Sequence, residues 1–180
     1  MPGVAMGVDR WRRHHEVSIL IAAGGVGRYF GSQPCASSWA DDAGKLVGVW
    51  KLNSFVTEIM QTKERRNQYG ANPKGYLIIT PERFMSIITA EGRKPPQTDE
   101  DRINGFRSMY AFTGPHRVEG DRLTTKVEVA WNEAWVGTDQ TRIFRIEGDK
   151  LFIESIPVPA TANHPEFGIT RGIVEWERSK

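Results

Sequence analysis

Alternating side chains mark the segment Leu46-Val-Gly-Val-Trp-Lys-Leu-Asn-Ser-Phe-Val56. In a β-strand, successive side chains point to opposite faces, so every second residue shares a surface. The face made by Trp50, Leu52, Ser54 and Val56 carries the largest apolar groups of the segment. The segment is therefore predicted to be a strand with one face buried.

Similar short segments follow through the rest of the chain and are separated by turn residues. We expect strands at 46–56, 76–80, 84–89, 110–118, 123–131, 140–146, 151–156 and 171–176. Asn72-Pro-Lys-Gly75 is predicted to be a turn, and Gly120-Asp121 and Gly148-Asp149 fit hairpin turns. Because the strands do not alternate with helices, the pattern argues against a parallel α/β sheet.

One helix is expected near residues 98–109. Thr98 is a suitable N-cap, and Asp99, Glu100 and Asp101 would occupy the first turn, where the helix dipole favours acidic groups. Ile103, Phe106 and Met109 recur at a spacing of three, which predicts that one stripe of the helix is buried.

Short strands with frequent turns and one short helix indicate an all-β domain, either a closed antiparallel barrel or a sandwich. Closure into a barrel of about eight strands would remove exposed sheet edges. The inside of such a barrel is either filled by side chains or wide enough for one small ligand.

Residues 1–40 differ from this pattern. The apolar run Val17–Gly27 is too short for a membrane-spanning helix, which needs about 20 residues, but it fits the core of a secretory signal. Arg10-Trp-Arg-Arg13 precedes it, and Ser38-Trp-Ala40 resembles a cleavage site. We expect either a signal peptide and export to the periplasm or beyond, or a disordered extension on a cytoplasmic protein. The mature domain would be 41–180, without an integral membrane segment.

Charge and composition exclude several classes of function. The chain has 24 Lys and Arg against 22 Asp and Glu, and the excess lies within residues 1–40, so 41–180 is neutral. A neutral domain without a basic stripe is not expected to bind nucleic acid. The single cysteine, Cys35, precludes an internal disulfide and a multi-thiolate zinc site. Neither a His-Glu-x-x-His metal motif nor a Gly-x-Ser-x-Gly nucleophile motif occurs, and we expect no metal and no cofactor.

Six ordered segments between residues 45 and 178 resemble the bacterial lipocalin-like domain family. They are Gly48-Val-Trp50, Asn72-Pro-Lys-Gly-Tyr-Leu-Ile-Ile-Thr-Pro81, Met85-Ser86, Trp135-Val-Gly-Thr-Asp-Gln-x-Arg-x-Phe144, Gly148-Asp-x-Leu151 and Val174-x-Trp-Glu-Arg178. The resemblance implies a single calycin-type, lipocalin-like barrel that binds a small, mostly apolar ligand. It also implies that Gly48, Trp50 and Arg178 close the narrow end.

A few lipocalin-like proteins act as cyclases or isomerases, so the resemblance leaves a second function open. In that alternative, the domain would be a cofactor-independent enzyme acting on a small hydrophobic metabolite inside the barrel. His116 or Tyr110 would then serve as the proton donor, since both share a face of the predicted strand 110–118. The structural alternative is that His116 is a satisfied core or rim residue.

Arg142 is the most informative polar residue of the predicted interior. It shares a strand face with Gln140 and Phe144, so it points inward if the apolar face does. An inward guanidinium could anchor a carboxylate or enolate oxygen, which would make the ligand acidic. Alternatively, it pairs with an internal acidic residue or stacks at one end of the barrel.

Aromatic residues complete the predicted ligand site. Trp131 and Trp135 flank the turn Asn132-Glu-Ala134 and are expected at the mouth of the pocket, although ordinary packing at a barrel end is the alternative. The predicted ligand-binding set is Arg142, Phe112, His116, Trp131, Trp135 and Phe144. The sequence specifies neither the ligand nor the oligomeric state.

Overall fold

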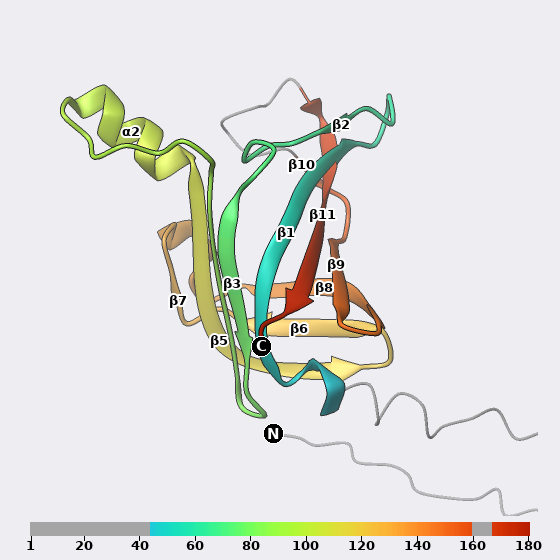
Figure 1. Ribbon diagram of the computed structural model, residues 1–180. Coiled ribbons are helices and arrows are strands. Elements are labelled where there is room, and N and C mark those ends of the chain that lie inside the picture. The colour runs from blue at the N-terminus through green and yellow to red at the C-terminus, as the bar shows by residue number, and fades with distance from the viewer. Residues whose placement is uncertain (1–43, 160–166) are drawn as a thin grey trace, which may run out of the picture. The chain divides into compact units, whose positions relative to one another are not determined.

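A computed structural model describes residues 44–159 and 167–180, so the predicted leader at 1–40 lies outside the described residues. In that part the chain forms eleven strands together with the α-helix α2 and the 3-10 turn η1, and residues 44–46 are also helical (Figure 1). In chain order they are β1 Gly48–Ile59, β2 Arg65–Arg66, β3 Lys74–Ile79, β4 Arg83–Thr89, α2 Asp99–Arg107, β5 Met109–Glu119, β6 Arg122–Lys126, β7 Val129–Ala130, the 3-10 turn η1 Glu133–Trp135, β8 Asp139–Glu147, β9 Lys150–Ser155, β10 Val158–Pro159 and β11 Ile169–Arg178.

Eight of these strands close into an antiparallel barrel, as predicted. Their order around the barrel is β1-β3-β4-β5-β6-β8-β9-β11, and β11 pairs back with β1. The two-residue strands β2, β7 and β10 add to β1, β5 and β11 respectively. No helix among the described residues has the length and apolar character needed to cross a bilayer.

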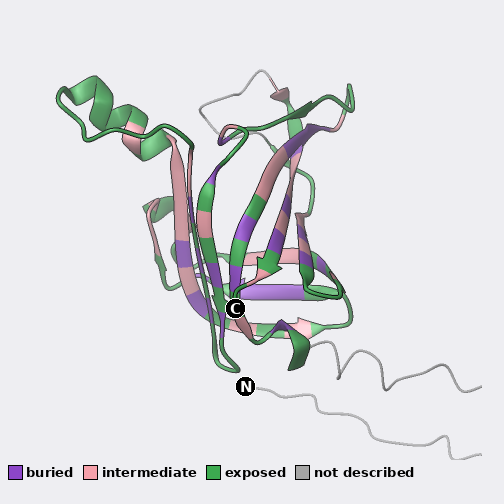
Figure 2. Ribbon diagram, viewed as in Figure 1, coloured by how far each residue is buried: buried purple, intermediate pink, exposed green. Residues whose placement is uncertain are grey.

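The alternating pattern of the strands produces the core. Buried and exposed residues alternate along β3 and β4, with Leu77, Ile79, Phe84 and Ile88 facing inward (Figure 2). The hairpin between the two strands sets this register by pairing Ile79 with Phe84. The sequence pattern that predicted the strands therefore also selects the inner face.

A β-bulge interrupts the alternation of β1. Leu52 pairs with Trp176 and Ser54 with Glu175, so Asn53 is an extra residue. A bulge shifts the side chains beyond it to the opposite face. Phe55 consequently faces the interior, and the predicted continuous face of Trp50, Leu52, Ser54 and Val56 is wrong beyond Leu52.

Trp50 and Arg178 meet where β1 and β11 pair, near one end of the barrel. The guanidinium carbon of Arg178 lies 4.1 Å from the ring centroid of Trp50. Arg178 also donates to the carbonyls of Lys45 and Val47, and Trp50 Nε1 donates to Leu46 O at 2.9 Å. These bonds fix the segment before β1 to the last strand and cover this end.

The helix α2 forms where it was expected, but its predicted buried stripe is wrong. Ile103 and Phe106 are 51% and 49% exposed, no residue of the helix is buried, and Met109 begins β5 instead. Figure 1 shows α2 extending away from the barrel. Its caps explain why it still forms, because Thr98 and Asp101 make a reciprocal capping box.

The expected strand at 123–131 is also divided. β6 ends at Lys126 and β7 begins at Val129, which is 63% exposed. Between them, Val127 N donates to Thr138 O and Glu128 N donates to Thr113 O. The chain changes its hydrogen-bonding partner here, so the face that points inward also changes.

Candidate functional site

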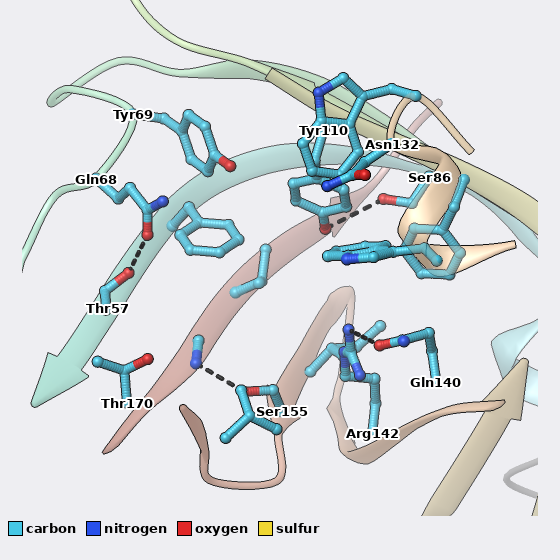
Figure 3. Close-up of a pocket in the computed structure, with 18 of the residues that line it drawn as sticks. Thr57, Gln68, Tyr69, Ser86, Tyr110, Asn132, Gln140, Arg142, Ser155 and Thr170 are labelled. Carbon is cyan, nitrogen blue, oxygen red and sulfur yellow. Dashed lines mark hydrogen bonds between the residues drawn. The ribbon is translucent and has the colours of Figure 1, made fainter. Parts of the chain in front are cut away.

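The barrel encloses a cavity of about 470 Å³ (Figure 3). Val158 and Pro159 of β10 border it, so it lies toward the end of the barrel that carries β2 and β10, away from Trp50 and Arg178. A volume of this size is typical of sites for small organic molecules. Its lining residues are Phe55, Thr57, Gln68, Tyr69, Phe84, Ser86, Tyr110, Phe112, Trp131, Asn132, Trp135, Gln140, Arg142, Ile153, Ser155, Val158, Pro159, Thr170, Gly172, Val174 and Trp176.

Aromatic rings form much of the cavity wall. The ring of Trp135 lies 5.6 Å from that of Phe112, 6.1 Å from that of Tyr110 and 5.1 Å from that of Trp131, measured between centroids. These edge-to-face and tilted contacts fix the rings relative to one another. The wall is therefore an ordered apolar surface to which a planar ligand can pack.

Arg142 reaches this cavity from β8. Its Nη1 donates to Thr141 O at 3.0 Å and its Nη2 to Gln140 Oε1 at 3.1 Å. No carboxylate of the described residues pairs with it, and burial lowers the pKa of Arg142. Since an arginine stays protonated in proteins, the cavity wall contains a cation whose hydrogen bonds go to neutral groups.

Tyr110 places a second polar group in the cavity, from β5. Ser86 Oγ donates to the phenolic oxygen of Tyr110 at 3.4 Å, so the phenolic proton of Tyr110 remains available (Figure 3). Burial raises the pKa of Tyr110, and the bond from Ser86 and the charge of Arg142 offset this only partly. The phenol is therefore neutral and able to donate a hydrogen bond.

A third polar group lies on β1 and the segment that follows β2. Thr57 Oγ1 donates to Gln68 Oε1 at 2.6 Å, and the neighbouring Tyr69 ring packs edge-on against Phe55 with centroids 4.9 Å apart. Burial raises the pKa of Tyr69 as well. Polar groups thus occur on several sides of an otherwise aromatic and aliphatic cavity.

The structure brings five of the predicted site residues together around the cavity. They are Arg142, Phe112, Trp131, Trp135 and Tyr110. Phe144 faces inward and belongs to the buried core, but it is not among the residues that line the cavity.

His116 is not among the residues that line the cavity. It pairs across the sheet with Thr125, and its Nδ1 is buried without a hydrogen-bond partner among the described residues. Burial lowers the pKa of His116, an effect that the charge of Glu82 opposes. The described cavity thus groups Tyr110 with Arg142 but not with His116, and the predicted contact of His116 with a ligand and its catalytic role stay predictions.

Several cavity residues were not predicted. Gln140 was expected on the same strand face as Arg142 but was left out of the predicted ligand-binding set. Ser86 lies on a face of β4 that alternation turns inward, so the pattern that located Arg142 could have located it too. Phe55 and Thr57 were missed because of the bulge in β1. Gln68 and Tyr69 lie in an irregular segment without periodicity, and no signal in the sequence places them at the cavity.

Metal-ligating side chains do not gather anywhere in the described part of the chain. No group of three or more His, Cys, Asp or Glu residues there has a geometry suited to a metal ion. The described cavity lining contains hydroxyl, amide, phenol and guanidinium groups but no carboxylate, imidazole or thiol. The lining therefore offers hydrogen-bond donors and acceptors from neutral groups and one positive charge.

Comparison with known proteins agrees with the barrel fold. The lipocalin-like domain matches residues 47–179, a range that contains all the barrel strands. No curated protein matches the chain. The match covers most of the sequence, and the chain therefore belongs to the family of lipocalin-like domains.

Proposed function

We propose that this protein binds a small, mostly apolar ligand that carries an acidic group, with that group held by Arg142. The observation that carries the proposal is a cation in an aromatic cavity of about 470 Å³ without a described carboxylate partner. A buried charge is costly unless it is paired. A carboxylate on the ligand would supply the missing pair and accept two parallel hydrogen bonds.

The neutral polar groups of the cavity support an orientation in which the acidic group of the ligand points toward Arg142. Arg142 uses two of its five N–H donors on Thr141 and Gln140, so donors remain for a ligand. The Tyr110 phenol lies in the same cavity and is kept neutral by burial. An acidic group bound beside Arg142 would leave the apolar body of the ligand against Phe112, Trp131 and Trp135.

Two fluorescent probes with the same aromatic body test this proposal. Pyrenebutyrate carries a carboxylate, whereas pyrenebutanol does not. Arg142→Met should weaken binding of pyrenebutyrate by about 10–100-fold, because a charge-assisted bond contributes roughly 1.5–3 kcal/mol. Binding of pyrenebutanol should change by less than about threefold, since its contacts are apolar.

The matched control is Arg145→Met, on the outer face of the same strand. Arg145 pairs with Glu147 and stacks on Phe152, so its loss tests the effect of removing a cation without touching the cavity. Equal binding of pyrenebutyrate by wild type and a folded Arg142→Met variant would contradict the proposal. Failure of both probes to bind wild type would contradict ligand binding altogether.

A cofactor-independent cyclase or isomerase would use the same cavity. Tyr110 supports this alternative because it offers a neutral proton donor next to Arg142. The described lining offers no matching base, and His116 lies elsewhere. Binding is therefore the function that the described geometry favours.

A further inference from the structure

Six apolar side chains form a continuous exposed surface on the outside of the barrel. They come from β1, β3 and β4 and the residue before β1, and each is between 38% and 48% exposed. We call this surface the β3–β4 face; its residues are Val47, Val49, Tyr76, Ile78, Met85 and Ile87. Strand pairing makes it continuous, since Val49 lies beside Ile78, Ile78 beside Met85, and Tyr76 beside Ile87.

The strands β8, β9 and β11 on the rest of the barrel are different in character. The outer faces of β8, β9 and β11 carry ion pairs that include Arg145–Glu147, Lys150–Glu175 and Arg171–Glu154. Exposed apolar residues there stand among charges: Ile143 pairs across the sheet with Arg122 and Glu154. The six side chains of the β3–β4 face carry no charge, and the charged residues on the same strand faces lie at its border: Lys51 beside Tyr76, Lys74 at the start of β3 and Arg83 at the start of β4. The two sides are therefore suited to different surroundings.

The exposed area of the β3–β4 face is large enough for a specific contact. Its side chains expose on the order of 500 Å² of surface to solvent, at the upper end of what a monomer usually exposes as one patch. Two such faces packed together would bury about 1,000 Å², which is near the lower limit for specific interfaces. Val129, exposed beside Thr113 in the same sheet, extends the area.

We propose that the protein forms a symmetric dimer through the β3–β4 face. In a two-fold interface the same patch meets itself, so an uncharged apolar surface is its own best complement. A membrane surface is less suited, because residues 41–180 have no net charge. Lys51, Lys74 and Arg83 border the face, but Arg83 is already paired with Glu128 at 2.7 Å. The cavity opens at the end of the barrel, so a contact along its side leaves ligand entry free.

Sedimentation equilibrium of the full chain tests the dimer. Wild type should be dimeric at about 100 μM, since contacts of this size commonly give micromolar dissociation constants. Ile78→Glu, at the centre of the face, should raise the dimer dissociation constant at least about tenfold by placing a charge in the contact. Met85→Glu should do the same from the neighbouring strand.

Ile143→Glu is the matched control. Ile143 is 37% exposed and Ile78 39%, so the two substitutions are alike except in the face they change. The control should remain dimeric, and circular dichroism should show all variants folded. A monomeric wild type, or a dimer that survives both Ile78→Glu and Met85→Glu, would overturn the proposal. A monomeric full chain that dimerises only after removal of 1–40 would overturn it for the intact protein.

Discussion

Gly48 shows how one residue controls the narrow end of the barrel. Its φ is 147°, and a Cβ added there would lie 2.6 Å from Arg178 Nη1. Gly48→Ala should therefore displace Arg178 from the ring of Trp50 and lower the free energy of unfolding by about 1–3 kcal/mol. Urea denaturation followed by tryptophan fluorescence measures this loss.

The control for Gly48 is Gly44→Ala. Gly44 has no atom within 4 Å of an added Cβ and has no positive φ. Its substitution should leave stability within about 0.5 kcal/mol of wild type. If the two variants lose stability equally, neither the backbone conformation of Gly48 nor its contact with Arg178 is the cause.

The ion pairs of Glu58 should make the stability of the fold depend on pH. It is 4% exposed and pairs with Arg65 at 3.0 Å and with Arg171 at 3.1 Å. The hydrogen bond from Arg65 is the main cause that holds the pKa of Glu58 below its usual 4.5, although desolvation opposes it. Because its folded-state pKa is lowered, its stabilising effect is present above pH 4.5 and disappears as the pH falls through the folded pKa.

Glu58→Gln should therefore melt at a lower temperature than wild type at pH 7. The difference should narrow steadily below pH 4.5, because wild type then loses the same ion pairs. Thermal melts between neutral pH and pH 3 measure it, with Glu133→Gln as an exposed control. A difference that stays constant over this range would show that the charge of Glu58 does not stabilise the fold.

At the scale of elements, α2 depends on its cap rather than on packing. Thr98 Oγ1 accepts from Asp101 N at 3.1 Å, and Asp101 Oδ2 accepts from the backbone of Gln97 and Thr98 at 3.0 Å each. Thr98→Ala should weaken the helix by about 1 kcal/mol. Since no residue of α2 is buried, hydrogen exchange should accelerate at 99–107 while the unfolding midpoint of the barrel stays almost unchanged.

If Thr98→Ala lowered the free energy of unfolding of the barrel by as much as it weakens α2, the helix would not be independent of the barrel. Ser108→Ala provides a comparison at the other end of the helix, where Ser108 Oγ donates to Gly105 O at 3.1 Å. Removal of this bond should have a smaller effect, because the backbone N–H of Ser108 still donates to Asn104 O.

The elements also show what the sequence could and could not predict. Strands such as β3 and β4 were predictable because each alternates without interruption, and the inward position of Arg142 followed from the same rule. The bulge in β1 depends on its register with β11, more than a hundred residues later. Alternation within one segment contains no information about such a partner, and Phe55 was missed for that reason.

The spacing of three in α2 was misleading for a related reason. Periodicity identifies a helix with an apolar stripe, but a stripe is buried only if another element lies against it. Here the helix contacts the barrel mainly at its end, where Trp131 Nε1 donates to Phe106 O at 3.0 Å and the two rings lie 5.5 Å apart. Position in the fold, rather than pattern, left Ile103 exposed.

At the scale of the whole molecule, the barrel is closed by joining the two ends of the domain. β1 and β11 pair along most of their length, from Trp50 beside Arg178 to Ile59 beside Thr170. The chain before β1 takes part in this closure, because Leu46 is fully buried and its carbonyl accepts from Trp50. The domain therefore needs the residues directly before β1 for its closure.

Two truncations test this requirement. The chain 41–180 keeps every described contact, so it should fold with a melting temperature within about 2 °C of the full chain and bind pyrenebutyrate equally well. The chain 48–180 lacks Leu46 and the carbonyls that hold Trp50 and Arg178. It should lose about 2–5 kcal/mol, the usual effect of deleting a large buried apolar side chain. Equal stability of both truncations would show that closure rests on the strand pairing alone. Loss of stability already at 41–180 would place part of the folded domain within residues 1–40.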